Sequence, residues 1–192
     1  MKISACKQLL AKLIFYMCNR SAYKMLAFGS LLVRPLRVEG KQFITLNTNV
    51  RVGDFVWLMA YKYMETDPQI VFGDHCAVGP FAHIFASGDM QFGQNVKIGH
   101  RVFIADITHD FEDINMPIIQ QKLKFLGQVR IGDGTVIGDN ACVMGSRIGK
   151  NCIIGENSVL MNADIPDHSV VEGNPYRITR RFDPVLRVWE KL

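Results

Sequence analysis

The chain has 192 residues, of which 48% are hydrophobic and 21% charged, so it is long enough for one buried core and short for two. Its net charge of +4 is concentrated at the ends of the chain, and the nearly balanced middle argues against a nucleic-acid-binding face. Five cysteines without a CxxC pair fit neither a disulfide framework nor a zinc site, so we expect a reducing, cytoplasmic environment and no metal.

Residues 1–37 contain seven Lys or Arg and no acidic residue, and residues 3–34 alternate the cations with large apolar residues. This pattern predicts one or two cationic amphipathic helices. Lys12, Arg20 and Lys24 interrupt the apolar stretches, so neither a transmembrane helix nor a cleaved signal peptide is expected. Two roles stay open for this segment: it caps the open end of the domain that follows, or it lies on the anionic surface of the inner membrane.

A six-residue repeat dominates the chain from residue 46 onward. Large apolar residues recur every six positions in sets of three, and a small or β-branched residue comes four positions after most of them. The large residues are Leu46, Val52, Leu58, Phe72, Val78, Ile84, Phe92, Ile98, Ile104, Ile131, Ile137, Val143, Ile148, Ile154 and Leu160. A helix repeats near 3.6 residues and an amphipathic strand near 2, so a period of six predicts short strands joined by corners, three to a triangular coil. We therefore predict an all-β fold, a parallel β-helix, over residues 38–175.

The spacing of the sets indicates where the chain leaves the coils. The sets begin at residues 46, 72, 92, 131 and 148, so their separations are 26, 20, 39 and 17, against 18 for a regular coil. The largest excess predicts a protruding loop at residues 107–128. A loop of this length in a compact domain is usually functional or disordered, and its apolar residues favour packing against a neighbouring subunit. Residues 176–192 are expected to form a C-terminal tail with a short helix.

Three motifs carry a resemblance to a known family. They are VFIADITHDFED at residues 102–113, IGDGTVIGDNACVMGSRIGKNCIIGENSVL at residues 131–160 and DIPDHSVVEGNPYRITR at residues 164–180. Together they resemble the hexapeptide-repeat acyltransferases, above all the bacterial O-antigen and capsule O-acetyltransferases, with the galactoside and maltose O-acetyltransferases more distant. The resemblance implies a left-handed winding of the β-helix, a homotrimer with active sites between subunits, and acetyl-CoA as co-substrate without a metal.

The resemblance also implies catalytic roles for three residues. His109 is the one histidine in the long loop, and it matches the family's general base, which takes a proton from the attacking sugar hydroxyl. Asp106 matches a carboxylate that orients this imidazole, with a plain corner role as an equal alternative. The backbone N–H of Asp139 matches the donor that stabilises the oxyanion, with an ordinary turn aspartate as the alternative.

Five further residues match binding positions of the family. Arg177, Arg180 and Asn157 match residues that bind acetyl-CoA, and guanidinium groups suit its phosphates. His83 and Phe81 lie in the corner that resembles the acceptor-binding side of the cleft, although an ordinary corner role stays open for His83.

The predicted function is acetyl-CoA-dependent O-acetylation of a sugar hydroxyl, on a surface polysaccharide or its lipid-linked precursor. Two alternatives stay open: N-acetylation of an amino sugar, which uses the same base and donor, and a non-catalytic assembly scaffold. A zinc enzyme of the carbonic-anhydrase kind is excluded, because it needs two histidines five residues apart and this chain has no such pair.

Overall fold

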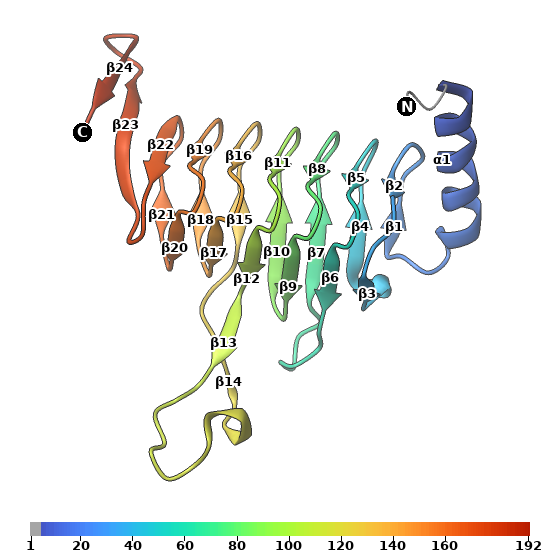
Figure 1. The fold of residues 1–192 in the computed structure, drawn as a ribbon, viewed down its shortest axis with the longest axis horizontal. Helices are drawn as coiled ribbons and strands as arrows, with labels where there is room; N and C mark the ends of the chain where they lie inside the picture. The colour runs from blue at the N-terminus through green and yellow to red at the C-terminus, as the bar shows by residue number, and fades with distance from the viewer. Residues whose placement is uncertain (1–4) are drawn as a thin grey trace.

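A computed structural model describes residues 5–192 of the chain. Helix α1 (Ala5–Asn19) comes first, and the rest of the chain winds into stacked coils of short parallel strands (Figure 1). The mostly β, parallel architecture predicted from the six-residue period is confirmed. Within residues 5–192, no helix combines the length and the apolar character needed to cross a bilayer.

Each coil contributes one strand to each of three sheets, except the last coil, which contributes only to the first two. The first sheet contains β1 (Met25–Leu26), β4 (Ile44–Leu46), β7 (Gln69–Phe72), β10 (Asp89–Phe92), β15 (Arg130–Ile131), β18 (Arg147–Ile148) and β21 (Asp164–Ile165). The second contains β2 (Leu31–Leu32), β5 (Arg51–Val52), β8 (Ala77–Val78), β11 (Lys97–Ile98), β16 (Val136–Ile137), β19 (Ile153–Ile154), β22 (Ser169–Glu172), β23 (Arg177–Asp183) and β24 (Val188–Lys191). The third contains β3 (Arg37–Glu39), β6 (Trp57–Ala60), β9 (His83–Ala86), β12 (Phe103–Ala105), β17 (Cys142–Met144) and β20 (Val159–Met161).

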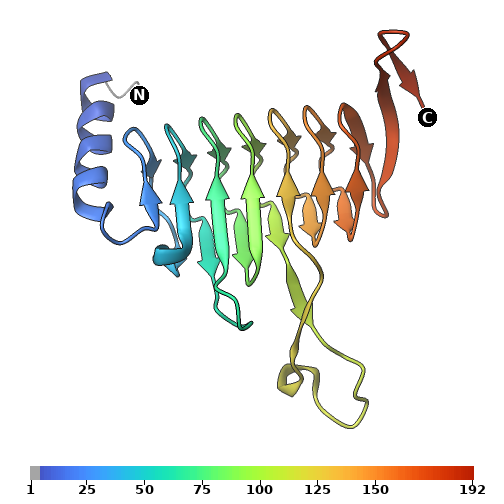
Figure 2. The ribbon, with the colours of Figure 1, turned by 180° about the vertical axis from the view of Figure 1, so that it is seen from behind.

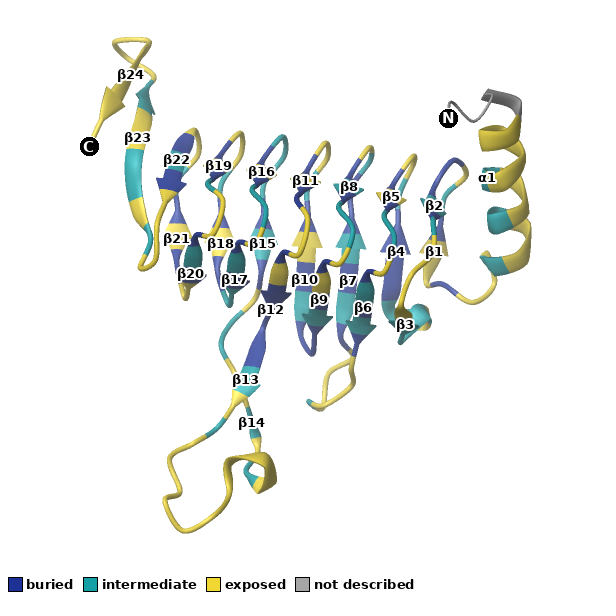
Figure 3. Cartoon of the chain, viewed as in Figure 1, coloured by how far each residue is buried: buried dark blue, intermediate teal, exposed yellow. Residues whose placement is uncertain are grey.

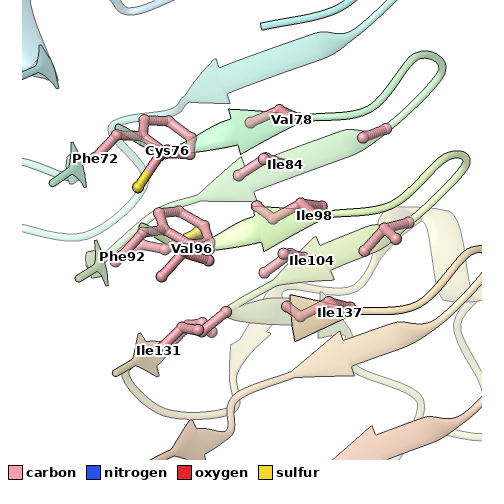
Figure 4. Packing of buried hydrophobic residues seen from close by; sticks show 14 of the residues in the cluster. Phe72, Cys76, Val78, Ile84, Phe92, Val96, Ile98, Ile104, Ile131 and Ile137 are labelled. Carbon is pink, nitrogen blue, oxygen red and sulfur yellow. The ribbon is translucent and has the colours of Figure 1, made fainter. Parts of the chain in front are cut away.

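The register of the strands stacks equivalent positions of the repeat on one another. Phe72 pairs with Phe92, and Ile98 pairs with Ile137, so the large residues form columns inside the stack (Figure 4). The rings of Phe72 and Phe92 lie parallel with their centroids 4.5 Å apart. Cys76 occupies a buried small position beside them, as expected for a core residue. Burial of these columns removes apolar surface from water, which is the main stabilising contribution to the fold.

The corners between strands need unusual backbone conformations. Among residues 5–192, twelve non-glycine residues have positive φ, and six of them are asparagines, the residue type that tolerates the left-handed region best after glycine. Gly73 serves a different purpose, since a Cβ at this position would lie 2.6 Å from the backbone of Gly93 in the next coil. The corners therefore approach one another closely enough for coils to stack at the spacing of neighbouring strands.

Both ends of the chain differ from the sequence-based boundaries. The helical segment predicted for residues 1–37 ends at Asn19, and the first coil begins at Met25 instead of residue 38, because β1 and β2 pair with β4 and β5. The predicted short C-terminal helix is wrong. Its residues form β24, which pairs antiparallel with β23, and β23 in turn adds to the open edge of β22.

Two excursions leave the stack near the third sheet (Figures 1 and 2). The longer one matches the predicted loop at residues 107–128, follows β12 and carries an antiparallel pair, β13 (Ile107–His109) and β14 (Leu123–Phe125). A short 3-10 helix, η2 (Ile118–Gln120), lies between them, and another, η1 (Lys41–Phe43), precedes β4. The shorter excursion follows β6 and ends before β7. The departures from the repeat thus gather on one side of the molecule.

Candidate active site

His109 lies at the end of β13, opposite Leu123 of β14. The backbone N–H of Leu123 donates a hydrogen bond of 2.9 Å to the hydroxyl of Tyr63, which belongs to the shorter excursion. The Tyr63 ring stacks on Tyr61, which in turn contacts Phe85 of the third sheet. This chain of contacts braces the hairpin against the stack directly beside His109, whose side chain is exposed in the single chain. Sequence reasoning missed Tyr63, because nothing in the repeat indicates that the two excursions meet.

Asp106 is fully buried at the base of the long excursion. Its two carboxylate oxygens accept hydrogen bonds from the backbone N–H groups of Ser87 (2.8 Å) and Gly88 (2.7 Å) in the preceding coil. Burial raises the pKa of this carboxyl above its ordinary value. No hydrogen bond within residues 5–192 joins Asp106 to His109. The carboxylate thus holds two amides of the preceding coil, and a role in orienting the His109 imidazole stays a prediction.

Asp139 lies at the corner between the second and third sheets, next to His100 at the same corner of the preceding coil. Its carboxylate accepts a hydrogen bond of 2.8 Å from the backbone N–H of His100 and lies 3.0 Å from the imidazole Nδ1. The bond from the His100 amide holds the pKa of Asp139 below its usual range. None of the backbone hydrogen bonds of residues 5–192 uses the Asp139 N–H as donor. His100 was not expected at this site, because the two residues are 39 positions apart in the sequence.

An apolar cavity of about 110 Å³ lies on the outer face of the third sheet. It is lined by Trp57, Met59, His83, Ile84, Phe85 and Phe103. The rings of Trp57 and His83 meet edge-on with centroids 5.6 Å apart. Phe81 is not among the lining residues and instead stacks on Phe55, at the corner before β9. The structure thus gathers His83 into an aromatic cavity and leaves Phe81 outside it, in a stack with Phe55.

The residues matched to acetyl-CoA binding lie in two places. Asn157 occupies the corner after β19, where its backbone N–H donates a hydrogen bond of 3.0 Å to the carbonyl oxygen of Asp139. Arg177 and Arg180 lie on β23 at the C-terminal end of the stack, and both are exposed. The structure therefore brings Asn157 to the Asp139 corner and leaves the two arginines on a separate strand.

His109 and Asp139 lie at opposite edges of the third sheet. The corner with Asp139 precedes the third-sheet strand of its coil, β17, whereas the excursion with His109 follows the third-sheet strand β12. One copy of the chain therefore does not bring the proposed base and the proposed oxyanion donor to one corner. In the part of the chain that the structure describes, no group of three or more His, Cys, Asp or Glu side chains is arranged to hold a metal ion.

The chain is similar in sequence to two curated proteins, although no family model matches it. It is 30% identical over 128 residues to WbbJ of Escherichia coli, which is named for lipopolysaccharide biosynthesis and O-acetyl transfer, and the match covers 64% of this chain and 65% of that protein. It is 31% identical over 131 residues to a Mycobacterium tuberculosis protein named as an acetyltransferase, covering 68% of this chain and 42% of that protein. The chain thus spans less than two thirds of the length of either relative.

Solved structures extend the comparison to nearly the whole fold. AntD, an N-acyltransferase from Bacillus cereus crystallised with dTDP and 3-hydroxybutyryl-CoA, superposes with a TM-score of 0.70 at 15% identity, covering 88% of this chain and 89% of that chain. A hexapeptide-repeat acetyltransferase from Vibrio cholerae, crystallised with acetyl-CoA, superposes with a TM-score of 0.57 at 21% identity, covering 93% of this chain and 90% of that chain. The chain resembles the hexapeptide-repeat acyltransferases in sequence and has their fold. The family resemblance inferred from the three motifs is confirmed, and the motifs lie on the coils and the excursion of this hexapeptide-repeat chain.

Proposed function

We propose that this hexapeptide-repeat chain transfers an acetyl group from acetyl-CoA to a sugar hydroxyl of a surface polysaccharide or its lipid-linked precursor, in the cytoplasm. The observation that carries the proposal is the exposed imidazole of His109 on a braced hairpin that departs from the repeat. The relative named for lipopolysaccharide O-acetyl transfer supports this class of acceptor. The neighbour crystallised with acetyl-CoA supports the donor.

The proposed chemistry needs one base and one oxyanion donor. A sugar hydroxyl is a poor nucleophile at neutral pH, so His109 removes its proton as the oxygen attacks the thioester carbonyl. The N–H of Asp139 donates to the carbonyl oxygen as it becomes negative. When the tetrahedral intermediate collapses, the C–S bond breaks and the departing sulfur takes the proton from the imidazolium. The products are an acetyl ester and free CoA.

We further propose that the active form is a homotrimer of left-handed β-helices, with each active site between two subunits. His109 and Asp139 lie at opposite edges of the third sheet, and this supports the proposal. A second copy can bring its Asp139 corner to the β13–β14 hairpin of the first copy, which carries His109. The long excursion also carries exposed apolar residues that favour a protein partner: Phe111, Ile114, Met116, Ile118, Ile119 and Phe125. Sedimentation equilibrium should give three times the chain mass of 21.7 kDa.

The substrates are assigned to the two remaining groups of residues. We propose that the acceptor sugar stacks over the aromatic cavity at Trp57 and His83, because a sugar ring has an apolar face. Phe81, stacked on Phe55 at the corner before β9, is assigned to the same acceptor. Acetyl-CoA is assigned to Asn157, Arg177 and Arg180, and the two exposed guanidinium groups suit its phosphates. Asp106 is assigned to holding the base of the excursion through the amides of the preceding coil.

The test is thiol release from acetyl-CoA in the presence of candidate glycans. The intact protein should release free thiol only with a suitable acceptor, and His109→Ala should lower turnover by about 10² or more. His75→Asn is the matched control, because His75 is an exposed corner histidine with positive φ that asparagine accommodates. If mild base hydrolyses the acetylated product, the product is an ester. If the product resists mild base, it is an amide formed by N-acetylation of an amino sugar. Absence of thiol release with hydroxyl and amino acceptors alike would leave a non-catalytic scaffold as the function.

A further inference from the structure

Aspartates recur at the corners of the coils, where each accepts a backbone N–H from a corner of the preceding coil. These carboxylates and the amides that donate to them are Asp74 with Thr48 (2.8 Å), Asp133 with Gln94 (2.9 Å), Asp167 with Lys150 (2.7 Å) and Asp139 with His100 (2.8 Å). An aspartate in one coil therefore closes a corner amide of the coil before it.

The amide of Asp139 itself is not closed in this way. The next coil places Glu156 at the equivalent position, since Asn157 after it donates to the Asp139 carbonyl just as Asn140 donates to the His100 carbonyl. The Glu156 side chain is exposed, and its carboxylate lies one methylene farther from the backbone than that of an aspartate. Within residues 5–192, no hydrogen bond uses the Asp139 N–H as donor. This amide is therefore open, as an oxyanion donor must be.

The carboxylate of Asp139 works against this role unless it is held in place. A negative charge beside a carbonyl oxygen that becomes negative raises the energy of the tetrahedral intermediate. An aspartate carboxylate can also bond to its own or a neighbouring backbone N–H, and so compete for the donor. The hydrogen bond from the His100 amide holds the pKa of Asp139 below its usual range, so the group is ionised at neutral pH.

Two side chains of the preceding coil face this carboxylate. The imidazole Nδ1 of His100 lies 3.1 Å and 3.0 Å from its two oxygens. The Nε of Arg101 donates a hydrogen bond of 2.7 Å to the side-chain oxygen of Asn140, the residue after Asp139. The side chains of His100 and Asp139 are 54% and 43% exposed, at the surface of the stack where most corner residues are exposed or half-buried (Figure 3).

We propose that His100 is a positioning residue for the proposed oxyanion donor, because its imidazole holds the Asp139 carboxylate against the preceding coil and keeps the Asp139 N–H free for the substrate. In this arrangement Nδ1 carries a proton and donates it to the carboxylate. His100 acts through Asp139 and not on the substrate. The inference rests on the proposed acetyl transfer and adds to it a residue 39 positions away from Asp139.

Kinetics of His100→Ala and Asp139→Asn, singly and together, test the proposal. His100→Ala keeps the backbone bond to Asp139 and removes the imidazole, so kcat should fall about tenfold while KM for acetyl-CoA and for the acceptor changes less than about twofold. In the Asp139→Asn background the same substitution should change kcat less than about twofold, because no negative charge is left to hold. His100→Asn should recover most of the kcat, since its side-chain amide places an N–H donor close to the position of Nδ1.

Lys97→Ala is the matched control for the loss of a basic side chain from this surface. Lys97 is exposed and lines the same groove as His100 and Asp139. In the described part of the chain, no ion pair joins it to Asp139. Its replacement should leave kcat within about twofold of the wild type, because an exposed charge without a direct contact is screened by salt.

Other results overturn the proposal. A higher KM with unchanged kcat in His100→Ala would show that His100 contacts a substrate. An equal loss of kcat in the Asp139→Asn background would show that His100 does not act through the carboxylate. A loss in Lys97→Ala as large as that in His100→Ala would show that only the general charge of the groove matters. Circular dichroism of each variant checks that the fold is retained.

The wild-type assay separates this inference from the proposed function. If the wild type releases no thiol from acetyl-CoA with any acceptor, the proposed acetyl transfer fails, and the role of His100 fails with it. If the wild type is active and His100→Ala retains the full kcat, only the role of His100 is removed.

Discussion

Apolar side chains are buried in the coil stack of this chain and exposed in its long excursion. In the stack, Phe72 is fully buried and packs on its counterpart in the next coil. In the excursion, Ile114 is 93% exposed, and most of its apolar neighbours are exposed as well. The stack therefore completes its core within one chain, whereas the excursion offers apolar surface to something outside it. We infer that the buried columns of the repeat supply stability and that the long excursion supplies the proposed base and an apolar surface for a partner.

Truncation of one side chain in each region tests whether the two differ in their contribution to stability. Phe72→Ala should lower the free energy of unfolding by about 3–5 kcal/mol, because it removes a buried ring and leaves a cavity. Ile114→Ala should change the free energy of unfolding of the single chain by less than about 0.5 kcal/mol, because its side chain is exposed. Urea unfolding followed by circular dichroism measures both. Comparable losses in the two variants would contradict the division into a stable stack and an open excursion.

The junction between the two regions is the second place to test. Asp106→Ala should lower the free energy of unfolding by about 2–4 kcal/mol, because two buried N–H groups lose their acceptor. Asp133→Ala is the control, since the Asp133 carboxylate accepts the exposed amide of Gln94 and pairs with the exposed Lys150 at 3.5 Å, and water can replace both. Burial raises the pKa of Asp106, so its contribution is complete below the ordinary carboxyl pKa and shrinks as pH rises through the raised one. Urea unfolding of the wild type and the Asp106→Ala variant, measured from about pH 3 to about pH 7, checks whether the difference in their free energies of unfolding shrinks as pH rises.

Cysteine reactivity compares the stack with the N-terminal helix. Burial raises the pKa of the Cys76 thiol from 9.0 to about 11, which lowers its thiolate fraction at neutral pH about 100-fold. Cys18 is exposed on α1. Iodoacetamide should therefore modify Cys18 at least about 100-fold faster than Cys76, as measured by mass spectrometry of the peptides. Similar rates would mean that the stack opens locally on the timescale of labelling.

The brace beside His109 gives the smallest expected effect. Tyr63→Phe removes the hydroxyl that accepts the Leu123 N–H and should lower kcat about two- to tenfold with little change in KM, because a hydrogen bond of about 1 kcal/mol is lost. Tyr61→Phe keeps the ring contacts of Tyr61 and should leave kcat unchanged. Hydrogen exchange at Leu123 should rise only in Tyr63→Phe. A rise in KM with unchanged kcat would show that Tyr63 acts in substrate binding instead of positioning the hairpin.

The regular coils were predictable because each hexad buries its large residue against the same position of its neighbours. Prediction failed at the ends, where that regularity is weak. Residues 25–32 lie within the segment 3–34, whose basic, apolar pattern predicted amphipathic helices. They contain β1 and β2 instead, because β4 and β5 offer open backbone groups to these strands. The C-terminal residues likewise became β24 because the edge formed by β22 and β23 accepts another strand.

The period of the coils, the excursion at residues 107–128 and the position of His109 near its start follow from the amino-acid sequence alone. Which distant residues meet depends on how the coils stack: Asp106 contacts the amides of Ser87 and Gly88, and His100 contacts Asp139. The physical reason is that stacking brings together residues one coil apart, while excursions make the coils unequal in length. The separation of contacting residues therefore changes from 18 positions for Asp106 and Gly88 to 39 positions for His100 and Asp139.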